Sequence, residues 1–164
     1  MKLSELSIVE LLRLNAETIE ELRRREVLTT SNAILGDYAE RLFRKAYGWI
    51  AAGNSARDFD ATDTDDVKYL IKSHRTTRRN GSRQLGALRG IDERNFDILA
   101  AAPFNEDFSV LRGALIPFET VQQEASRVER TNSWRFMLRD HVWNLPGVID
   151  CPRELKQAQK APLC

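Results

Sequence analysis

Hydrophobic residues recur at every third or fourth position near the start of the chain, which is the spacing of one face of an α-helix. Residues 3–26 are therefore predicted to form an amphipathic helix with charged residues between its apolar positions. A second stretch with this spacing runs from about residue 36 to residue 53, and Asp37 is a candidate N-terminal cap for it. The predicted apolar faces are Leu3, Leu6, Val9, Leu12, Ile19 and Leu22 in the first helix and Leu35, Tyr38, Ala39, Leu42, Phe43 and Ala46 in the second.

After residue 53 the period changes towards two, which is typical of β-strands. Strands are predicted at residues 57–61, 67–74, 96–102 and 108–116. Residues 105–107 are expected to form the hairpin turn between the last two strands. Pro117 is expected to end the last strand before a helix at 118–128, and the segment from Cys151 onwards is predicted to be a short helix followed by disorder. This mixture predicts an α/β domain, with a central mixed sheet flanked by helices and an extra N-terminal amphipathic helix.

Composition supports one packed domain: the chain has 164 residues, 42% of them hydrophobic, with three tryptophans and seven phenylalanines. No window approaches the roughly 20 apolar residues that span a bilayer. Glu5 and Glu10 interrupt the N-terminal stretch where a secretory signal would be apolar, so we expect a cytoplasmic protein without membrane contact. Cys151 and Cys164 have no CxxC spacing and no histidine at ligand spacing, so free thiols are expected and a zinc site is disfavoured.

Aspartates gather between residues 57 and 66, directly before the strand predicted at 67–74. Alternation along that strand places Val67, Tyr69, Ile71 and Ser73 on one face, expected to lie in the core, and Lys68, Leu70, Lys72 and His74 on the other, expected to be cationic apart from Leu70. Asp60, on the preceding predicted strand, is expected to face Lys72. Carboxylates beside a lysine can hold Mg²⁺ and position a hydroxide, which is the apparatus needed to attack a phosphodiester.

Each of these residues also has an ordinary structural interpretation. Glu40 lies three residues after the candidate cap and could complete a capping box. Asp63, Asp65 and Asp66 could form a hairpin turn through hydrogen bonds from the backbone to their side chains. Lys72 could be a lysine on a half-exposed strand, with its stem packed and its charge in water.

Charge is unevenly distributed along the chain. The net charge is only +1, but residues 68–94 contain eight basic and two acidic residues, a net of +6. Such a segment can meet a phosphate backbone, whereas arginines in loops are also commonly solvated and paired with nearby acids. The run begins directly behind the candidate metal site, which favours nucleic acid as the partner. The candidate contacts are Arg75, Arg78, Arg79, Arg83 and Gln84.

A series of short motifs carries a resemblance to a known superfamily. They are, in order, Gly36-Asp37-Tyr38-Ala39-Glu40, Asn54-Ser55, Phe59-Asp60-Ala61, Tyr69-Leu70-Ile71-Lys72-Ser73, Ser82-Arg83-Gln84-Leu85, Asn132-Ser133-Trp134-Arg135-Phe136 and Trp143-Asn144-Leu145-Pro146-Gly147-Val148. The motifs up to Ser73 resemble the PD-(D/E)XK restriction endonuclease-like superfamily, and the later ones resemble an uncharacterised bacterial family of small proteins with that core. The similarity extends from about Leu3 to Glu154. It implies a single domain over residues 1–164, with an N-terminal helix in 1–30, a nuclease-like core in 31–150 and a C-terminal tail in 151–164.

The resemblance implies metal-dependent hydrolysis of phosphodiester bonds in nucleic acid, with double-stranded DNA as the expected substrate in a restriction or defence setting. Asp60 and Glu40 would bind Mg²⁺ or Mn²⁺ together with the backbone carbonyl of Ile71, and Asp63 is a second-choice ligand. Lys72 would orient the attacking water. The implied catalytic residues are therefore Asp60, Lys72 and Glu40.

One position departs from the superfamily pattern, which has Glu, Asp or Gln two residues before the lysine where this chain has Leu70. A leucine cannot bind Mg²⁺, and this hard cation needs oxygen ligands in near-octahedral geometry. The alternative interpretation is a nuclease fold without catalysis that binds nucleic acid or a protein partner. Under either interpretation, the amphipathic N-terminal helix is a candidate homodimer contact.

Overall fold

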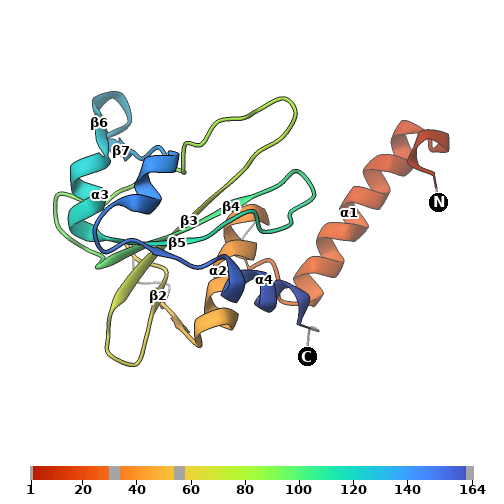
Figure 1. Ribbon diagram of the computed structural model, residues 1–164. Coiled ribbons are helices and arrows are strands. Elements are labelled where there is room, and N and C mark those ends of the chain that lie inside the picture. Colours follow the sequence, from red (N-terminus) through yellow and green to blue (C-terminus); the bar gives the residue numbers. More distant parts are fainter. Residues whose placement is uncertain (1, 30–33, 54–57, 162–164) are drawn as a thin grey trace.

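The computed structural model describes residues 2–29, 34–53 and 58–161. Its centre is a mixed six-stranded sheet in the order β1-β2-β3-β4-β5-β8 (Figure 1). The strands of this sheet are β1 (Ile50–Ala51), β2 (Ala61–Thr62), β3 (Lys68–Arg75), β4 (Ile98–Phe104), β5 (Ala114–Pro117) and β8 (Ile149–Asp150), and a separate hairpin consists of β6 (Ser126–Val128) and β7 (Ser133–Arg135). The predicted α/β class with a mixed central sheet is confirmed.

Helices cover both faces of the sheet. The described residues form the helices α1 (Ile8–Arg24), α2 (Ile34–Tyr47), α3 (Phe118–Glu124) and α4 (Pro152–Lys160), with 3-10 turns η1 (Leu3–Glu5), η2 (Glu129–Thr131) and η3 (Asp140–Asn144), and α1 does not cover the sheet. α2 and α4 pack against each other and against one face, whereas α3 and η3 contribute to the core on the other. Within the described ranges, no helix is long and apolar enough to cross a bilayer.

β3 and β4 are parallel and form the middle of the sheet, and β2 and β5 pair with them in antiparallel orientation. Parallel neighbours need a crossover connection, which here consists of residues 76–97. β4 is buried on both sides, since Ala100 and Ala102 belong to one core cluster and Ala101 to the other. A strand covered on both faces is typical of the parallel part of a sheet.

Core clusters lie on both faces of β3, and the second face is cationic apart from Leu70 as predicted, with Lys68 exposed and Lys72 half-buried. Tyr69 and Ile71 lie in the core cluster that includes α2 and α4. Leu70 is only 5% exposed and belongs to the opposite cluster with Leu85 and Leu99. Alternation assigned these side chains to the correct faces, but it did not reveal that the crossover covers the second face.

The N-terminal helix begins later than residue 3, because a capping box sets its first turn. The Ser7 side chain accepts the Glu10 N–H, and the Glu10 carboxylate accepts the Ser7 N–H at 2.8 Å. α1 therefore starts at Ile8, after a separate 3-10 turn.

The second helix also differs from its prediction at both ends. α2 ends at Tyr47 rather than near residue 53, because Gly48 turns the chain with a φ of +70°. The predicted cap at Asp37 is wrong, since α2 already begins at Ile34. Asp37 is instead buried in the first turn and accepts the Thr29 N–H at 2.9 Å.

The predicted hairpin after β4 is confirmed, but its second strand is shorter than predicted. The Asn105 N–H donates to the Ser109 carbonyl at 2.9 Å, which closes the turn. From there the chain makes a single bridge to β4 at Val110, and β5 begins only at residue 114. Pro117 ends β5 as predicted.

Two other predicted ranges need correction, and one is confirmed. The strand predicted at 57–61 is the short β2 at 61–62, and residue 57 lies outside the described residues. The helix predicted at 118–128 ends at residue 124, because residues 126–128 form β6 and pair with β7. The helix predicted after Cys151 is confirmed as α4, whose Leu155 is fully buried against the core. The disorder predicted beyond it concerns residues 162–164, which are not described.

Candidate active site

Asp60 closes the end of β2 against the outer edge of β3. Its N–H donates to the Tyr69 carbonyl at 2.8 Å, and its carboxylate accepts the Ile71 N–H at 2.7 Å. β2 pairs with β3 only as far as Tyr69, so the Asp60 side chain takes the next backbone donor along this edge. This contact fixes one carboxylate oxygen of Asp60 to the edge of the sheet.

The carbonyl of Ile71 faces the same edge. The N–H and C=O groups of one strand residue point to the same side, as the paired bonds of antiparallel ladders require. Because the Ile71 N–H donates to Asp60, the Ile71 carbonyl is directed towards Asp60 rather than towards β4. The Asp60 carboxylate and the Ile71 carbonyl, which are two of the expected metal ligands, are therefore neighbours at this edge.

Glu40 approaches this edge from α2, where its carboxyl is half-buried. The pKa of Glu40 is raised to about 7, first by burial and then by the nearby charges of Asp60 and Asp37, while the charges of Lys72 and Arg44 oppose this change. The pKa of Asp60 is also raised by burial, against the Ile71 N–H bond and the charge of Lys72. The charges of Asp60 and Lys72 act on Glu40, and that of Lys72 acts on Asp60, so the three residues predicted to be catalytic lie within electrostatic range of one another.

Lys72 is half-buried on β3, beside Ala101 of β4. A Cβ added at Gly86 would lie 3.9 Å from its Cδ atom, so the crossover runs along the lysine stem. The stem is partly covered, as the structural interpretation of Lys72 expected, and its charge acts on both acidic groups. Packing and an electrostatic role coexist at this position.

The donor set suits a Mg²⁺ ion held by few protein ligands. Two carboxyls with raised pKa values lie near a single lysine, and a divalent cation would offset their mutual repulsion. Mg²⁺ sites often use one or two carboxylates, several waters and the phosphates of the substrate. Across residues 2–29, 34–53 and 58–161, no group of three or more His, Cys, Asp or Glu side chains is arranged to hold a metal ion. Glu40, Asp60 and the Ile71 carbonyl are the oxygen groups that would hold such an ion.

Asp63 lies in the turn between β2 and β3, where the turn itself engages both of its carboxylate oxygens. One oxygen accepts the N–H groups of Asp65 and Val67 at 2.9 and 3.1 Å, and the other accepts the Tyr69 hydroxyl at 2.8 Å. The hydrogen bond from Tyr69 contributes most to the lowered pKa of Asp63. This geometry matches the hairpin-turn interpretation of the aspartate cluster.

Several of the predicted nucleic-acid contacts already have protein partners. Arg75 lies over the Phe108 ring, 4.2 Å from its centroid, and Arg78 pairs with Glu106 at 3.8 Å. Arg83 pairs with Asp140 at 2.6 Å. Arg79 and Gln84 are exposed. All of these residues except Arg75 lie on the crossover, which runs directly from β3 beside Lys72.

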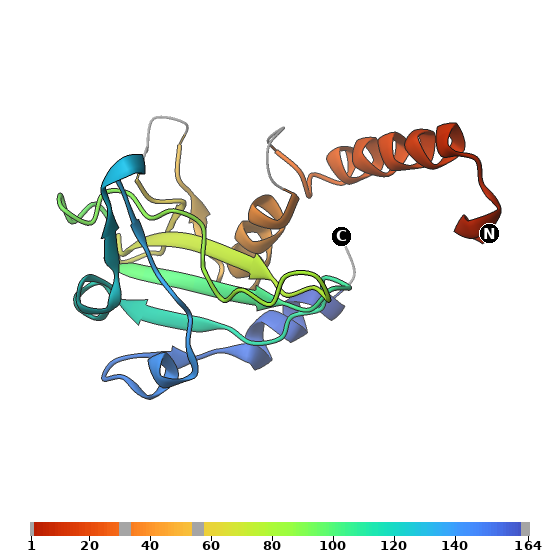
Figure 2. The same ribbon diagram turned by 90° about the horizontal axis from the view of Figure 1, so that it is seen from above.

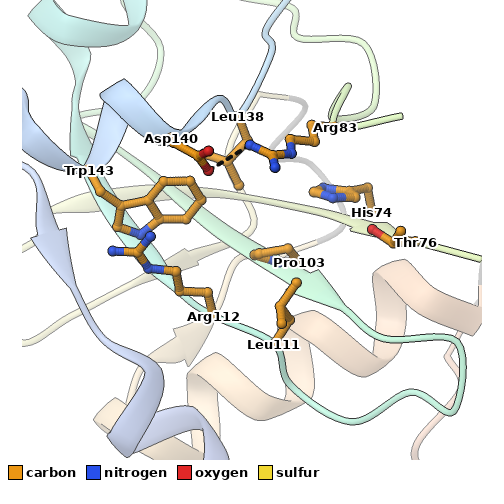
Figure 3. Close-up of a pocket in the computed structure, with 9 residues that line it drawn as sticks. All are labelled: His74, Thr76, Arg83, Pro103, Leu111, Arg112, Leu138, Asp140 and Trp143. Carbon is orange, nitrogen blue, oxygen red and sulfur yellow. Dashed lines mark hydrogen bonds and ion pairs between the residues drawn. The ribbon is translucent and has the colours of Figure 1, made fainter. Parts of the chain in front are cut away.

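A small pocket lies further along β3, two positions beyond Lys72 (Figure 3). It has a volume of about 100 Å³ and is lined by His74, Thr76, Arg83, Pro103, Leu111, Arg112, Leu138, Asp140 and Trp143. His74 points into it, and its Nδ1 atom is buried without a hydrogen-bond partner. Burial and then the charge of Arg83 lower the pKa of His74.

His74 was not predicted to be functional, because no nucleophile that a histidine could activate lies at a recognisable spacing from it along the chain. Its only signal was alternation, which places it on the same face of β3 as Lys72. The other charged residues of the pocket, Arg83, Arg112 and Asp140, come from other segments and meet His74 only in the folded chain.

Glu40 should make stability depend on pH. Since its pKa is about 7 in the folded chain against an ordinary value of 4.5, its contribution to the free energy of unfolding is complete below about pH 4.5 and is lost as the pH rises through about 7. We expect the Tm in metal-free buffer to fall across this window, and Glu40→Gln to remove part of that fall. Thermal unfolding of both proteins at several pH values measures the difference. Parallel profiles would contradict the raised pKa.

No protein-family model matches this chain, and no curated protein sequence matches it.

Proposed function

We propose that this chain hydrolyses phosphodiester bonds of nucleic acid with the help of Mg²⁺ or Mn²⁺. The observation that supports this best is the convergence of Glu40, Asp60 and Lys72 at the open edge of β3. They come from a helix, from the end of a short strand and from the central sheet. Two carboxylates beside a lysine, next to a backbone carbonyl, supply metal ligands and a cation in one place.

Each residue has a distinct role in this proposal. Asp60 and Glu40 hold the metal, and the bond from the Ile71 N–H keeps the Asp60 carboxylate in position. Lys72 orients the attacking water and balances negative charge on the phosphate. A bound Mg²⁺ ion supplies Lewis-acid polarisation of the phosphate and lowers the pKa of a bound water.

We further propose that the sheet is a restriction endonuclease-like core. Support comes from the order along the chain of a helical glutamate, an aspartate at the end of a short strand and a lysine on the adjacent strand. α2, which carries Glu40, packs on β3, which carries Lys72.

Double-stranded DNA is the proposed substrate, with the crossover as its contact surface. The crossover begins at residue 76, just beyond Lys72, and it carries the exposed side chains of Arg78, Arg79 and Gln84. Contacts of arginine with phosphate hold the backbone without reading sequence. An approaching phosphate would compete with Asp140 for Arg83, so part of the binding energy would be spent on opening that ion pair.

Metal binding should be visible without any substrate. We expect Mg²⁺ or Mn²⁺ to raise the Tm, more at about pH 8 than at about pH 5, because only the deprotonated carboxyls bind the ion. Asp60→Ala should abolish the rise, measured by thermal unfolding across a metal titration. Asp65→Ala is the matched control, since Asp65 is an exposed aspartate of the neighbouring turn. An equal rise in wild type and Asp60→Ala would place the metal elsewhere.

The second candidate function is a nuclease fold that binds nucleic acid or a protein without cutting, and Leu70 favours it. Leu70 stands where the superfamily pattern has an oxygen ligand, and it is buried in the core. Conversion of supercoiled plasmid to the nicked or linear form with Mg²⁺ or Mn²⁺ separates the two functions. Salt-sensitive filter binding without cleavage would support the nucleic-acid module. If the chain neither cleaves nor binds nucleic acid, the protein-binding form of this function would be favoured.

A further inference from the structure

α1 extends away from the sheet domain with its N-terminus farthest out (Figures 1 and 2). None of its residues is buried. In its first half, Ile8 is 77% exposed, Leu12 65% and Leu11 38%. A helix that leaves several large apolar side chains in water calls for a partner.

The second half of the same helix borders an apolar groove of about 530 Å³. α1 contributes Asn15, Thr18, Ile19 and Leu22 to this groove. The opposite wall includes Tyr38 and Leu42 of α2 and Ala158 of α4. It also includes Phe108, which lies between β4 and β5. The groove therefore lies between the second half of α1 and the body of the domain.

The two halves present one continuous face of the helix. At 100° per residue, Ile8, Leu11 and Leu12 project within about 60° of the direction of Asn15. Thr18, Ile19 and Leu22, which follow Asn15 in the helix, also project within about 60° of its direction. The first half of this face is exposed to solvent, and the second half faces the groove.

This face is nearly symmetric about Asn15. Ile8 and Leu22 lie equally far before and after it, and so do Leu11 and Ile19. A two-fold axis at Asn15 would place each first half opposite the second half of the other copy, as an isologous contact requires. The apolar segment would span about 21 Å at 1.5 Å per residue.

We propose that a second copy of this chain occupies the groove, with the two α1 helices antiparallel and crossing at Asn15. The exposed residues Ile8, Leu11 and Leu12 of each copy enter the groove of the other copy. One contact then covers the two apolar features that the single chain leaves open. Asn15 meets its counterpart at the centre, where a paired polar side chain sets register.

Cysteine cross-linking tests the position of the axis, on a background in which Cys164 is serine. Asn15→Cys should form a disulfide-linked dimer under mild oxidation, because each introduced thiol faces its own copy. Glu17→Cys is the matched control, since it lies on the opposite side of α1 and should remain monomeric. Equal cross-linking of the two variants, or none with Asn15→Cys, would overturn the proposal.

The direction of the helices has its own test. Ile8→Cys and Leu22→Cys should cross-link when the two variants are mixed, but neither should do so alone. Strong cross-linking of Ile8→Cys alone would indicate parallel helices and overturn the antiparallel arrangement.

Sedimentation of the full chain over a concentration series tests the contact without cross-linking. The wild type should associate as a dimer, and Ile8→Glu with Leu12→Glu should weaken association by about 100-fold or more, because two acids would enter an apolar groove. Arg13→Glu adds an acid on the outer face and should leave association nearly unchanged. A wild type that stays monomeric throughout, or equal weakening by both variants, would contradict the proposal. The outcome does not depend on whether the chain is a nuclease.

Discussion

Lys72→Ala is expected to lower the rate of metal-dependent plasmid cleavage by about 1000-fold or more. The substitution removes the side chain that is proposed to orient the attacking water and to balance negative charge on the phosphate. The fold should survive, since the lysine is half-buried and its stem is covered only in part by the crossover. The measurement is the initial rate of conversion of supercoiled plasmid with Mg²⁺ or Mn²⁺. The Tm of the variant should remain close to that of the wild type.

Lys68→Ala is the matched control for this variant. Lys68 lies on the same strand and the same face, four residues earlier, but it is exposed and lies over the Phe59 ring. It should retain cleavage close to the wild-type rate. Equal losses in the two variants would indicate a general effect of surface charge on DNA binding. Full activity of Lys72→Ala would contradict the role proposed for Lys72.

Leu70→Gln is expected to destabilise the chain by about 3 kcal/mol, from lost packing and an amide buried without partners. At this chain length, that loss corresponds to a fall in Tm of roughly 10 °C. The reason is the surroundings of Leu70, which is 5% exposed within a cluster that contains Leu85 and Leu99. Chemical and thermal unfolding measure the change.

Leu70→Met is the control, because it conserves volume and should cost less than about 1.5 kcal/mol. If Leu70→Gln kept wild-type stability, the side chain at this position would be able to leave the core and reach the edge near Asp60. Cleavage gained by Leu70→Gln alone would then identify a nuclease that has lost a ligand. Cleavage by the wild type would show that two carboxylates suffice.

The local elements and the candidate residues could be predicted from the sequence. Period and alternation predicted two N-terminal helices, the strand that carries Lys72 and the correct faces for Tyr69 and Leu70. These patterns are local, because side-chain direction follows from the backbone repeat. The Ser7 and Glu10 capping box was also present in the sequence, and it explains the later start of α1.

The surroundings of those residues could not be predicted from the sequence. Alternation shows which side chains share a face but not what covers that face, so the burial of Leu70 required the crossover to be placed over β3. The contact between the Asp60 carboxylate and the Ile71 N–H depends on where β2 stops pairing. The pocket around His74 joins segments far apart in the chain.

The sequence by itself determined the residue types and the local periodicity: an α/β domain, an amphipathic first helix, and an aspartate and a lysine on neighbouring strands. Only the tertiary structure decided that Glu40 lies within electrostatic range of these two residues, that Asp63 is engaged within its turn and that the apolar face of α1 remains uncovered. The physical reason is range. Backbone geometry fixes a periodic pattern within a few residues, whereas burial, pKa shifts and exposed faces depend on segments that meet only when the whole chain folds.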